Sequence, residues 1–424
     1  MTNLAWNVER VLPSAIADLH RLISIPSISS MPEHDADVAA CADAVSGLFR
    51  DLGASEVKLL DGGGKPAVWA NFPGPEGTPT VLLYAHYDVQ PTGDACAWTS
   101  PAFEPAERNG RLYARGSADD KGGVALHLAA LRVFNGTPPV GVKVFIEGEE
   151  EIGSPSMPAL LDRYRDELVA DVYVVADSVN WEVGKPSLTT SLRGVAACEV
   201  TVSTLAEGLH SGQFGGVVPD ALTALCRLLA TLHDEAGNVA IEGLVSGHGP
   251  DLDYPEDRLQ EETGLLEGVS QTGDGSVVER MWFKPAASVL AIDATPVAKA
   301  SNTLVPSARA KVSVRLAPGQ DPAAAAKALE EHLRSHAPWG VRVEIDSEQV
   351  GAPSRITLDG PRAEAARAAF REAFGVEAVE IGCGGSIPIV AEFADRNPGA
   401  LVLVTAVTDP NSRMHGIDES LDLG

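Results

Sequence analysis

Five residues of the kinds that bind divalent metal ions stand at or just after the ends of apolar segments in this 424-residue chain. Runs such as VLLYAH and DVYVVAD are typical of core β-strands, and parallel strands bring their carboxyl ends to one edge of a sheet. Two imidazoles and three carboxylates, one of them shared, can hold a pair of zinc-like ions that activate a water for hydrolysis. The pattern predicts a two-metal hydrolase with these ligands: His86, Asp119, Glu151, Asp177 and His415.

Eight motifs surround these residues and occur in order between residues 86 and 419. They are HYDVQP (86–91), RGSADDKGG (115–123), EGEEEIGS (147–154), LHSGQFGG (209–216), NTLVP (302–306), SVRLAP (313–318), GGSIP (384–388) and MHGIDE (414–419). A lone histidine or acid at a strand end is weak evidence, because most such residues are solvated. The ordered set resembles the M20 family of metallopeptidases, and within it the cytosolic dipeptidase and carnosinase-like branch.

The resemblance assigns the ligands to two metal sites. It implies that Asp119 bridges two ions, that His86 and Asp177 complete one site, and that Glu151 and His415 complete the other. Zinc is the expected metal, and manganese or cobalt could replace it, because nitrogen and oxygen ligands without sulfur select weakly among these ions. The family also implies a cis peptide bond between Asp119 and its neighbour Asp120.

Two further acids are candidates for catalysis. Glu150 precedes a ligand and could accept the proton of the activated water, which makes it the expected general base. Because Glu149, Glu150 and Glu151 are consecutive, any of them could instead be a surface charge. The family pattern EGxEExGS favours Glu150 as the base and Glu151 as the ligand. Asp88 follows His86 by two residues and matches the family acid that hydrogen-bonds the ligand imidazole.

Candidate substrate contacts lie in the later motifs. His210 resembles the family histidine that reaches the active site of the other subunit in a dimer and stabilises the oxyanion there. Arg315 could pair with a substrate carboxylate through two parallel hydrogen bonds. Thr303, Gly385 and Ser386 could donate further hydrogen bonds to the same carboxylate. A small peptide substrate and a homodimer are the expected partners.

Changes of periodicity divide the chain into two domains. Segments 11–25 and 34–53 are typical of amphipathic helices, and the strands and helices that alternate after them predict an α/β sandwich with a largely parallel sheet. From about residue 192 to 355 the order becomes βαββαβ, the ferredoxin-like unit, with a loop-rich stretch at 240–285. We therefore expect a zinc-peptidase-like catalytic domain formed by residues 1–191 and 356–424, interrupted by a ferredoxin-like α+β lid and dimerisation domain at 192–355.

Composition restricts the partners and the compartment. A formal charge of −27 disfavours nucleic acids and anionic membranes, because phosphates would be repelled. No apolar run approaches the ~20 residues of a membrane span, and the first residues lack the continuous apolar stretch of a signal peptide. The five cysteines are widely spaced and form no CxxC pair, so reduced thiols and a cytoplasmic location are expected.

Two departures from the family pattern bear on the substrate. Gly382-Cys383 stands where family dipeptidases often carry Arg-Glu, so the pocket is expected to be reshaped. The sequence also ends five residues after Glu419, where relatives usually continue into a helix, which could leave a groove open on the catalytic domain.

Three functions remain open at this stage. A dipeptidase or short-peptide metallopeptidase is favoured by the HSGQFGG, SVRLAP and GGSIP motifs together. An amidohydrolase of N-acyl amino acids or carbamoyl compounds would use the same metal centre. The third possibility is a non-catalytic metal-binding or interaction protein, and the intact Glu150 argues against it.

Overall fold

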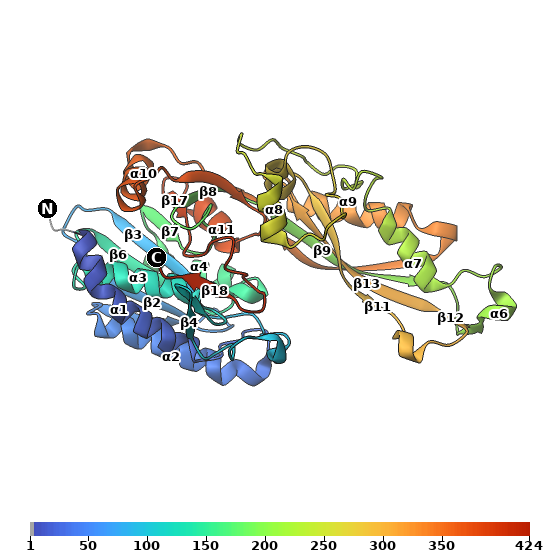
Figure 1. Cartoon of the computed structure of the whole chain (residues 1–424), viewed down its shortest axis with the longest axis horizontal. Coiled ribbons are helices and arrows are strands. Elements are labelled where there is room, and N and C mark those ends of the chain that lie inside the picture. The colour runs from blue at the N-terminus through green and yellow to red at the C-terminus, as the bar shows by residue number, and fades with distance from the viewer. Residues whose placement is uncertain (1–3) are drawn as a thin grey trace. The chain divides into compact units, whose positions relative to one another are not determined.

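The computed structural model describes residues 4–424, which form two compact units (Figure 1). The first contains the residues up to Thr190 together with Ile356–Ile381 and Ile387–Gly424. The second contains Ser191–Arg355 and Gly382–Ser386. Its last segment lies outside the predicted insertion of residues 192–355. The structure does not fix the position of one unit relative to the other.

A six-stranded sheet forms the centre of the first unit, with the strand order β1-β2-β6-β3-β7-β17. The four strands β6, β3, β7 and β17 are mutually parallel, whereas β2 is antiparallel to both of its neighbours. The strand bounds are β1 Glu56–Leu60, β2 Ala67–Phe72, β3 Thr80–His86, β6 Gly141–Glu147, β7 Val172–Val175 and β17 Leu401–Val404.

Helices pack on both faces of this sheet. On one face, α2 (Asp35–Asp51) and α3 (Lys121–Val133) bury Phe49 and Leu128 against Val144 of β6. On the other face, Phe393 of α11 (Pro388–Arg396) stacks on Tyr173 with ring centroids 4.0 Å apart. The further helices of this unit are α1 (Leu4–Ile23), α4 (Met157–Arg163), α5 (Arg165–Leu168) and α10 (Gly360–Phe374). The predicted α/β sandwich is confirmed.

The parallel strands bring the candidate ligands to one edge of the sheet. His86 is the last residue of β3, and the acids at 149–151 follow the end of β6. Asp177 lies two residues after β7, and His415 lies in the segment that follows β17. Because parallel strands end at the same edge, residues far apart in sequence converge there.

The second unit contains a four-stranded antiparallel sheet with the order β11-β13-β9-β14. Its elements follow one another as β9 (Gly194–Ser203), α7 (Ala221–Ala230), β11 (Ala286–Asp293), β13 (Ser307–Leu316), α9 (Pro322–Ser335) and β14 (Arg342–Gly351). This sequence and strand order give the predicted ferredoxin-like βαββαβ unit, and Figure 1 shows α7 and α9 beside the sheet. The 240–285 stretch is mostly loop, with the helix α8 (Glu256–Thr263) inside it.

Strand alternation gives this second sheet one apolar and one polar face. Val312, Val314 and Leu316 of β13 are buried with Leu225 of α7 and Leu329 of α9. Successive side chains of a strand point to opposite faces. The intervening residues of β13, which include Arg315, therefore lie on the face opposite the helices.

Smaller elements complete the described chain. The C-terminal β18 (Ser420–Asp422) pairs with β5 (Arg111–Tyr113), which pairs with β4 (Ala106–Arg108). A three-stranded sheet joins β15 (Ser354–Arg355), β8 (Ser187–Leu192) and β16 (Val379–Cys383). The remaining strands and helix, β10 (Leu209–His210), β12 (Thr303–Leu304) and α6 (Ser211–Phe214), carry the HSGQF motif and its partner.

The predicted start of the first helix was wrong. Helix α1 begins at Leu4 and continues past Pro13, whereas the amphipathic pattern predicts a start at residue 11. A proline inside a helix removes one backbone N–H donor, and here burial of Ala15, Leu19 and Leu22 beyond it outweighs that loss. None of the helices in the described part of the chain combines the length and apolar character needed to cross a bilayer.

Candidate metal centre

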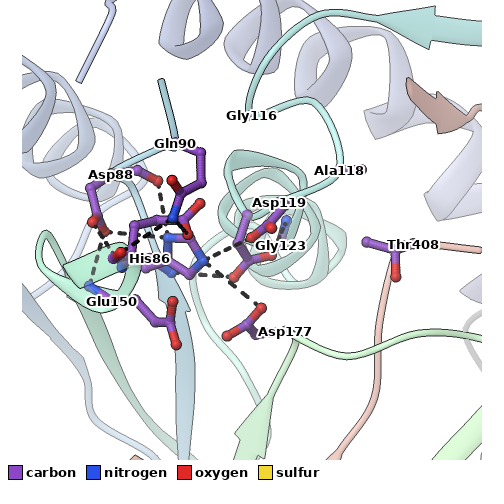
Figure 2. A network of polar contacts seen from close by, with 12 residues as sticks. His86, Asp88, Gln90, Gly116, Ala118, Asp119, Gly123, Glu150, Asp177 and Thr408 are labelled. Atoms are coloured by element: carbon purple, nitrogen blue, oxygen red, sulfur yellow. Dashed lines mark hydrogen bonds and ion pairs between the residues drawn. The ribbon is translucent and has the colours of Figure 1, made fainter. Parts of the chain in front are cut away.

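Asp119 lies between the two candidate imidazoles. Its Oδ1 is 3.1 Å from Nε2 of His86, and its Oδ2 is 3.1 Å from Nε2 of His415. Figure 2 shows the Asp119 carboxylate pointing toward the His86 ring. A carboxylate that offers one oxygen to each of two imidazoles has the arrangement needed to bridge two ions.

One more acid approaches each imidazole. Asp177 Oδ1 lies 3.8 Å from Nε2 of His86, and Glu151 Oε2 lies 3.2 Å from Nε2 of His415. Two ligands bound tetrahedrally to zinc at ~2.0–2.1 Å are about 3.4 Å apart, so these separations fit metal coordination. The structure therefore brings the five predicted ligands together in two groups that share Asp119.

The backbone fixes which nitrogen of His86 can bind a metal. Nδ1 of His86 lies 3.0 Å from the main-chain oxygen of Asp88. A carbonyl oxygen can only accept, so Nδ1 carries the proton and donates it. In the neutral ring the lone pair is then on Nε2, the atom that faces Asp119 and Asp177. His86 is thus prepared to act as a ligand through Nε2.

The carboxylate of Asp88 lies beside the His86 ring and also holds a neighbouring turn. Its Oδ1 is 3.3 Å from Nδ1 of His86, and the same nitrogen lies 3.0 Å from the Asp88 carbonyl oxygen. The two carboxylate oxygens accept hydrogen bonds from the backbone N–H groups of Glu150 and Glu151, at 3.2 and 3.1 Å. Asp88 therefore holds the turn after β6 against the end of β3 (Figure 2).

The three consecutive acids have distinct surroundings. Glu149 is buried, and its carboxylate accepts hydrogen bonds from the backbone N–H groups of Lys65 and Ser156. A Cβ at Gly64 would lie 2.1 Å from Glu149 Oε1, so the DGGGKP loop needs glycine there for this close approach. Glu150 instead offers an oxygen within 4.8 Å of the ligand atoms of His86 and Asp177.

Asp120 connects the other ligand-bearing segments. The bond between Asp119 and Asp120 is cis, as the family resemblance implies. Asp120 caps α3 by accepting from the backbone N–H of Gly123 at 3.2 Å, and its other oxygen accepts from the backbone N–H of His86 at 3.2 Å. A side chain at position 123 would collide with that carboxylate, which explains the glycine in the DDKGG run.

The site concentrates negative charge in a buried place. Burial and the neighbouring Asp177 raise the pKa of Glu150 well above its usual range. Burial also raises the pKa of Asp177. Hydrogen bonds with Asp119 and then Glu151 raise the pKa of His415 to about 10. The raised pKa values of Glu150 and Asp177 reflect buried carboxylates close to other acids, and divalent cations would supply positive charge beside them.

Sequence reasoning missed two residues of this region. Gln90 donates from Nε2 to Glu151 Oε2 at 2.8 Å and to the Glu151 carbonyl at 3.2 Å. Its position two residues after Asp88 on the same side of the chain was the available signal. Glu419, which ends the MHGIDE motif, accepts a hydrogen bond from the backbone N–H of Asp119 at 3.1 Å. No sequence pattern pointed to that bond.

The predicted substrate-binding residues all belong to the second unit. His210 and Thr303 face each other in the short β10–β12 ladder. Arg315 lies on β13, and Gly385 and Ser386 lie in the loop after β16. Because the position of the second unit relative to the first is not fixed, the structure does not place these five residues beside the metal ligands.

The comparison with family models decides the classification. The model described as "Peptidase family M20/M25/M40" matches residues 82–424. The chain belongs to the M20 peptidase family. It is therefore a metallopeptidase, and the resemblance of its motifs to this family is confirmed.

This M20 peptidase is similar to known dipeptidases over its whole length. It is 36% identical to the cysteinylglycine-S-conjugate dipeptidase of Corynebacterium striatum over 427 residues, which cover 99% of this chain and 93% of the relative. The beta-Ala-His dipeptidase of Rattus norvegicus is 27% identical over 88% of this chain and 82% of the relative. Among solved structures, the Saccharomyces cerevisiae di-peptidase Dug1p superposes with a TM-score of 0.88, 24% identity and coverage of 100% of this chain and 94% of that one.

If Asp119 bridges two ions, replacing it should remove more metal than replacing a ligand that binds a single ion. We predict that Asp119→Ala loses both divalent ions and that His415→Ala retains about one, because His415 pairs with Asp119 and Glu151 and so belongs to one of the two proposed sites. Elemental analysis of mildly purified protein measures the stoichiometry, with a wild-type value near two. Equal metal content in the two variants would rule out the bridging arrangement.

Proposed function

We propose that this M20 peptidase is a two-metal dipeptidase that hydrolyses the amide bond of dipeptides or short peptides. The observation that carries the proposal is the Asp119 carboxylate, with one oxygen 3.1 Å from each of two imidazole nitrogens. The dipeptidase names of its relatives support the substrate class. A panel of dipeptides, tripeptides and N-acyl amino acids assayed with metal-reconstituted protein tests it.

The donor set fits two divalent cations per chain, with zinc as the expected metal. Imidazole nitrogens and carboxylate oxygens also accept manganese and cobalt. When bound, such ions would polarise the scissile carbonyl and make an attacking water more acidic. The five cysteines are widely spaced and form no CxxC pair, which supports the proposal of a reducing, cytoplasmic compartment.

Glu150 is the proposed general base. Its carboxylate lies beside His86 and Asp177, and its backbone N–H is held by Asp88. A base in this position can take the proton of the attacking water and return it to the leaving amine. The raised pKa of Glu150, caused first by burial and then by Asp177, increases its proton affinity.

Arg315 is proposed to bind the substrate carboxylate. Additional hydrogen-bond donors would come from Thr303, Gly385 and Ser386. Arg315 is half-buried on β13, and no described carboxylate lies within ion-pair distance of it. A planar guanidinium can make two parallel hydrogen bonds to a carboxylate. This contact would favour substrates with a free C-terminus over internal peptide bonds.

His210 is the proposed oxyanion donor, acting across a homodimer. Its Nδ1 accepts a hydrogen bond from the backbone N–H of Gly212 at 3.1 Å, so in the neutral ring Nε2 carries the proton and can donate it. A Cβ at Gly212 would lie 2.9 Å from the ring, so glycine is needed at that position. His210 is exposed, as a residue that reaches another subunit would be.

The edge strand β11 supports dimerisation through the second unit. β11 is the outer strand of its sheet and exposes three apolar side chains, Val289, Leu290 and Ile292, by 44%, 59% and 42%. An exposed apolar edge is a ready site for pairing with another strand, and a two-fold axis would place two such edges together.

Two other functions were open from the sequence. An amidohydrolase of N-acyl amino acids or carbamoyl compounds would keep the metal ligands and differ only in the pocket. A non-catalytic metal-binding protein would have no use for Glu150. The panel separates them, because an amidohydrolase would prefer N-acyl substrates and a non-catalytic protein would turn over none.

Replacing the proposed base should abolish turnover and leave the metals in place. We predict that Glu150→Gln lowers turnover of a dipeptide such as Cys-Gly by at least the ~10²–10⁴-fold typical of general acid-base catalysis. Metal content, measured in parallel, should stay near the wild-type value because Gln keeps the size of the side chain. Loss of an ion in this variant would identify Glu150 as a ligand, and wild-type turnover would refute its role.

The role of Arg315 is tested by comparing acids with amides. Arg315→Lys keeps the positive charge and loses the planar fork, so dipeptide hydrolysis should weaken by about 1.5–3 kcal/mol in kcat/KM. The loss on the matching C-terminal amides should be much smaller, because they carry no carboxylate. Equal losses on both substrates would assign Arg315 a structural role.

Complementation tests whether His210 acts in the other subunit. We predict that inactive His210→Ala chains mixed with inactive Glu150→Gln chains recover activity, because a hybrid dimer would contain one complete site. Each variant mixed with itself is the matched control. Subunit exchange without recovery would contradict action across the dimer and would favour a role of His210 in its own chain, or a purely structural role.

A further inference from the structure

Glu419 is a fully buried carboxylate with four hydrogen-bond donors around it. Oε2 accepts from Arg115 Nη1 at 2.7 Å and from the backbone N–H of Gly116 at 3.1 Å. Oε1 accepts from the backbone N–H groups of Ala118 and Asp119 at 2.9 and 3.1 Å. Three of its four donors are therefore backbone groups in the loop that ends in Asp119.

Arg115 extends this cluster to two more segments. It is buried as well, and its Nη2 donates to the carbonyl oxygens of Pro91 and Gly416, each at 3.2 Å. Its guanidinium lies 5.5 Å from the ring centroid of Trp98. The Arg115 guanidinium thus joins the HYDVQP segment, the RGSAD loop and the MHGIDE segment.

Each of these three segments carries a candidate metal ligand. Pro91 follows His86 in the same motif, Asp119 ends the loop held by Glu419, and Gly416 is adjacent to His415. To bind the same ion, Asp119 and His415 must be held at a closely defined separation. The segments that bring them together are almost 300 residues apart in sequence, so a direct tie between them is needed.

An ordinary buried ion pair would not explain this arrangement. Burying two charges costs several kcal/mol each, and a pair retained only for stability gains little over apolar packing. Here the carboxylate bonds the backbone N–H of a proposed ligand, and the guanidinium bonds the carbonyl next to another. Outer partners of metal ligands orient those ligands, and their loss typically lowers metal affinity ~10–100-fold.

We propose that the Arg115–Glu419 pair is a positioning device that sets the distance between Asp119 and His415, and so determines the affinity of the metal site that His415 completes. This inference rests on the proposed two-metal function. Neither residue is a proposed metal ligand. Both act through the backbone of the segments that carry the ligands.

The amide of glutamine is the sharpest replacement for Glu419. Glu419→Gln keeps the shape but turns one acceptor oxygen into an NH₂ group that faces N–H donors. Either Arg115 and Gly116 or Ala118 and Asp119 then lose their acceptor. The segment that carries His415 and Glu419 should shift away from the Asp119 loop, while His86 and Asp177, which lie at or just after the ends of β3 and β7, should keep their positions.

Asp409 provides a matched control in the same region. Its buried carboxylate accepts from Arg111 Nη2 at 2.8 Å and ties the C-terminal segment to β5. Its other donors are the backbone N–H of Asn411 and the hydroxyl of Ser412, which lie outside the 115–119 loop. Asp409→Asn therefore breaks a comparable ion pair near the C-terminus and should leave the metal sites unchanged.

The experiment is a titration of the metal-free proteins with Co²⁺, using wild type, Glu419→Gln and Asp409→Asn. Calorimetry and the visible absorption of bound cobalt measure the binding. Wild type and Asp409→Asn should bind two ions. Glu419→Gln should bind one ion with nearly normal affinity and the second ~10–100-fold more weakly, with a changed cobalt spectrum. Circular dichroism establishes that each variant is folded.

The outcomes separate this inference from the function on which it rests. If wild type binds no ion, the proposed function fails and the inference fails with it. If wild type and folded Glu419→Gln bind two ions with equal affinity and equal spectra, only the positioning role is refuted. If Glu419→Gln does not fold, Arg115→Lys replaces it, because lysine keeps the charge but cannot reach three acceptors. If folded Arg115→Lys binds both ions with wild-type affinity, the positioning role is refuted. Weaker binding of the second ion would support it.

Discussion

Repulsion between carboxylates that meet at one edge of the central sheet is the constraint on which the rest of the structure depends. Asp119, Glu150, Glu151 and Asp177 converge around two imidazoles in a largely buried site. Two imidazoles cannot compensate four acids, so the arrangement needs additional positive charge. Divalent cations supply that charge in a small volume, which is why the same residues both define the site and make it unfavourable without ions.

The acids of the motifs differ in the partners of their carboxylates. Asp88, Asp120, Glu149 and Glu419 accept hydrogen bonds from backbone N–H groups and so fix the loops at the strand ends. Asp119 and Glu151 direct their oxygens toward imidazole nitrogens. Backbone donors help to stabilise the first group, and the second group is available for metals. The family motifs are acid-rich because they encode both groups.

In the proposed function, the second unit meets a different requirement, the recognition of the substrate. Its ferredoxin-like sheet buries one face against α7 and α9 and presents polar side chains, Arg315 among them, on the other. The β10–β12 ladder holds His210 opposite Thr303, and Gly212 fixes the tautomer of His210. Under this proposal the candidate metal ligands and the candidate substrate contacts lie in different units, so a substitution such as Gly382-Cys383 can alter the substrate contacts without changing the metal ligands.

The sequence by itself determined the α/β class, the ferredoxin-like order and the identities of the candidate ligands, because local periodicity and strand ends reveal where acids and histidines converge. It did not determine that Glu149 accepts from the backbone of Lys65, that the Asp88 carboxylate bonds the turn after β6, or that Gln90 reaches Glu151. Only the tertiary structure decided these contacts. Hydrogen bonds between Asp119 and Glu419, or between Arg115 and the carbonyl beside His415, join residues about 300 positions apart. Such bonds depend on the packing of whole loops, and no local pattern records them.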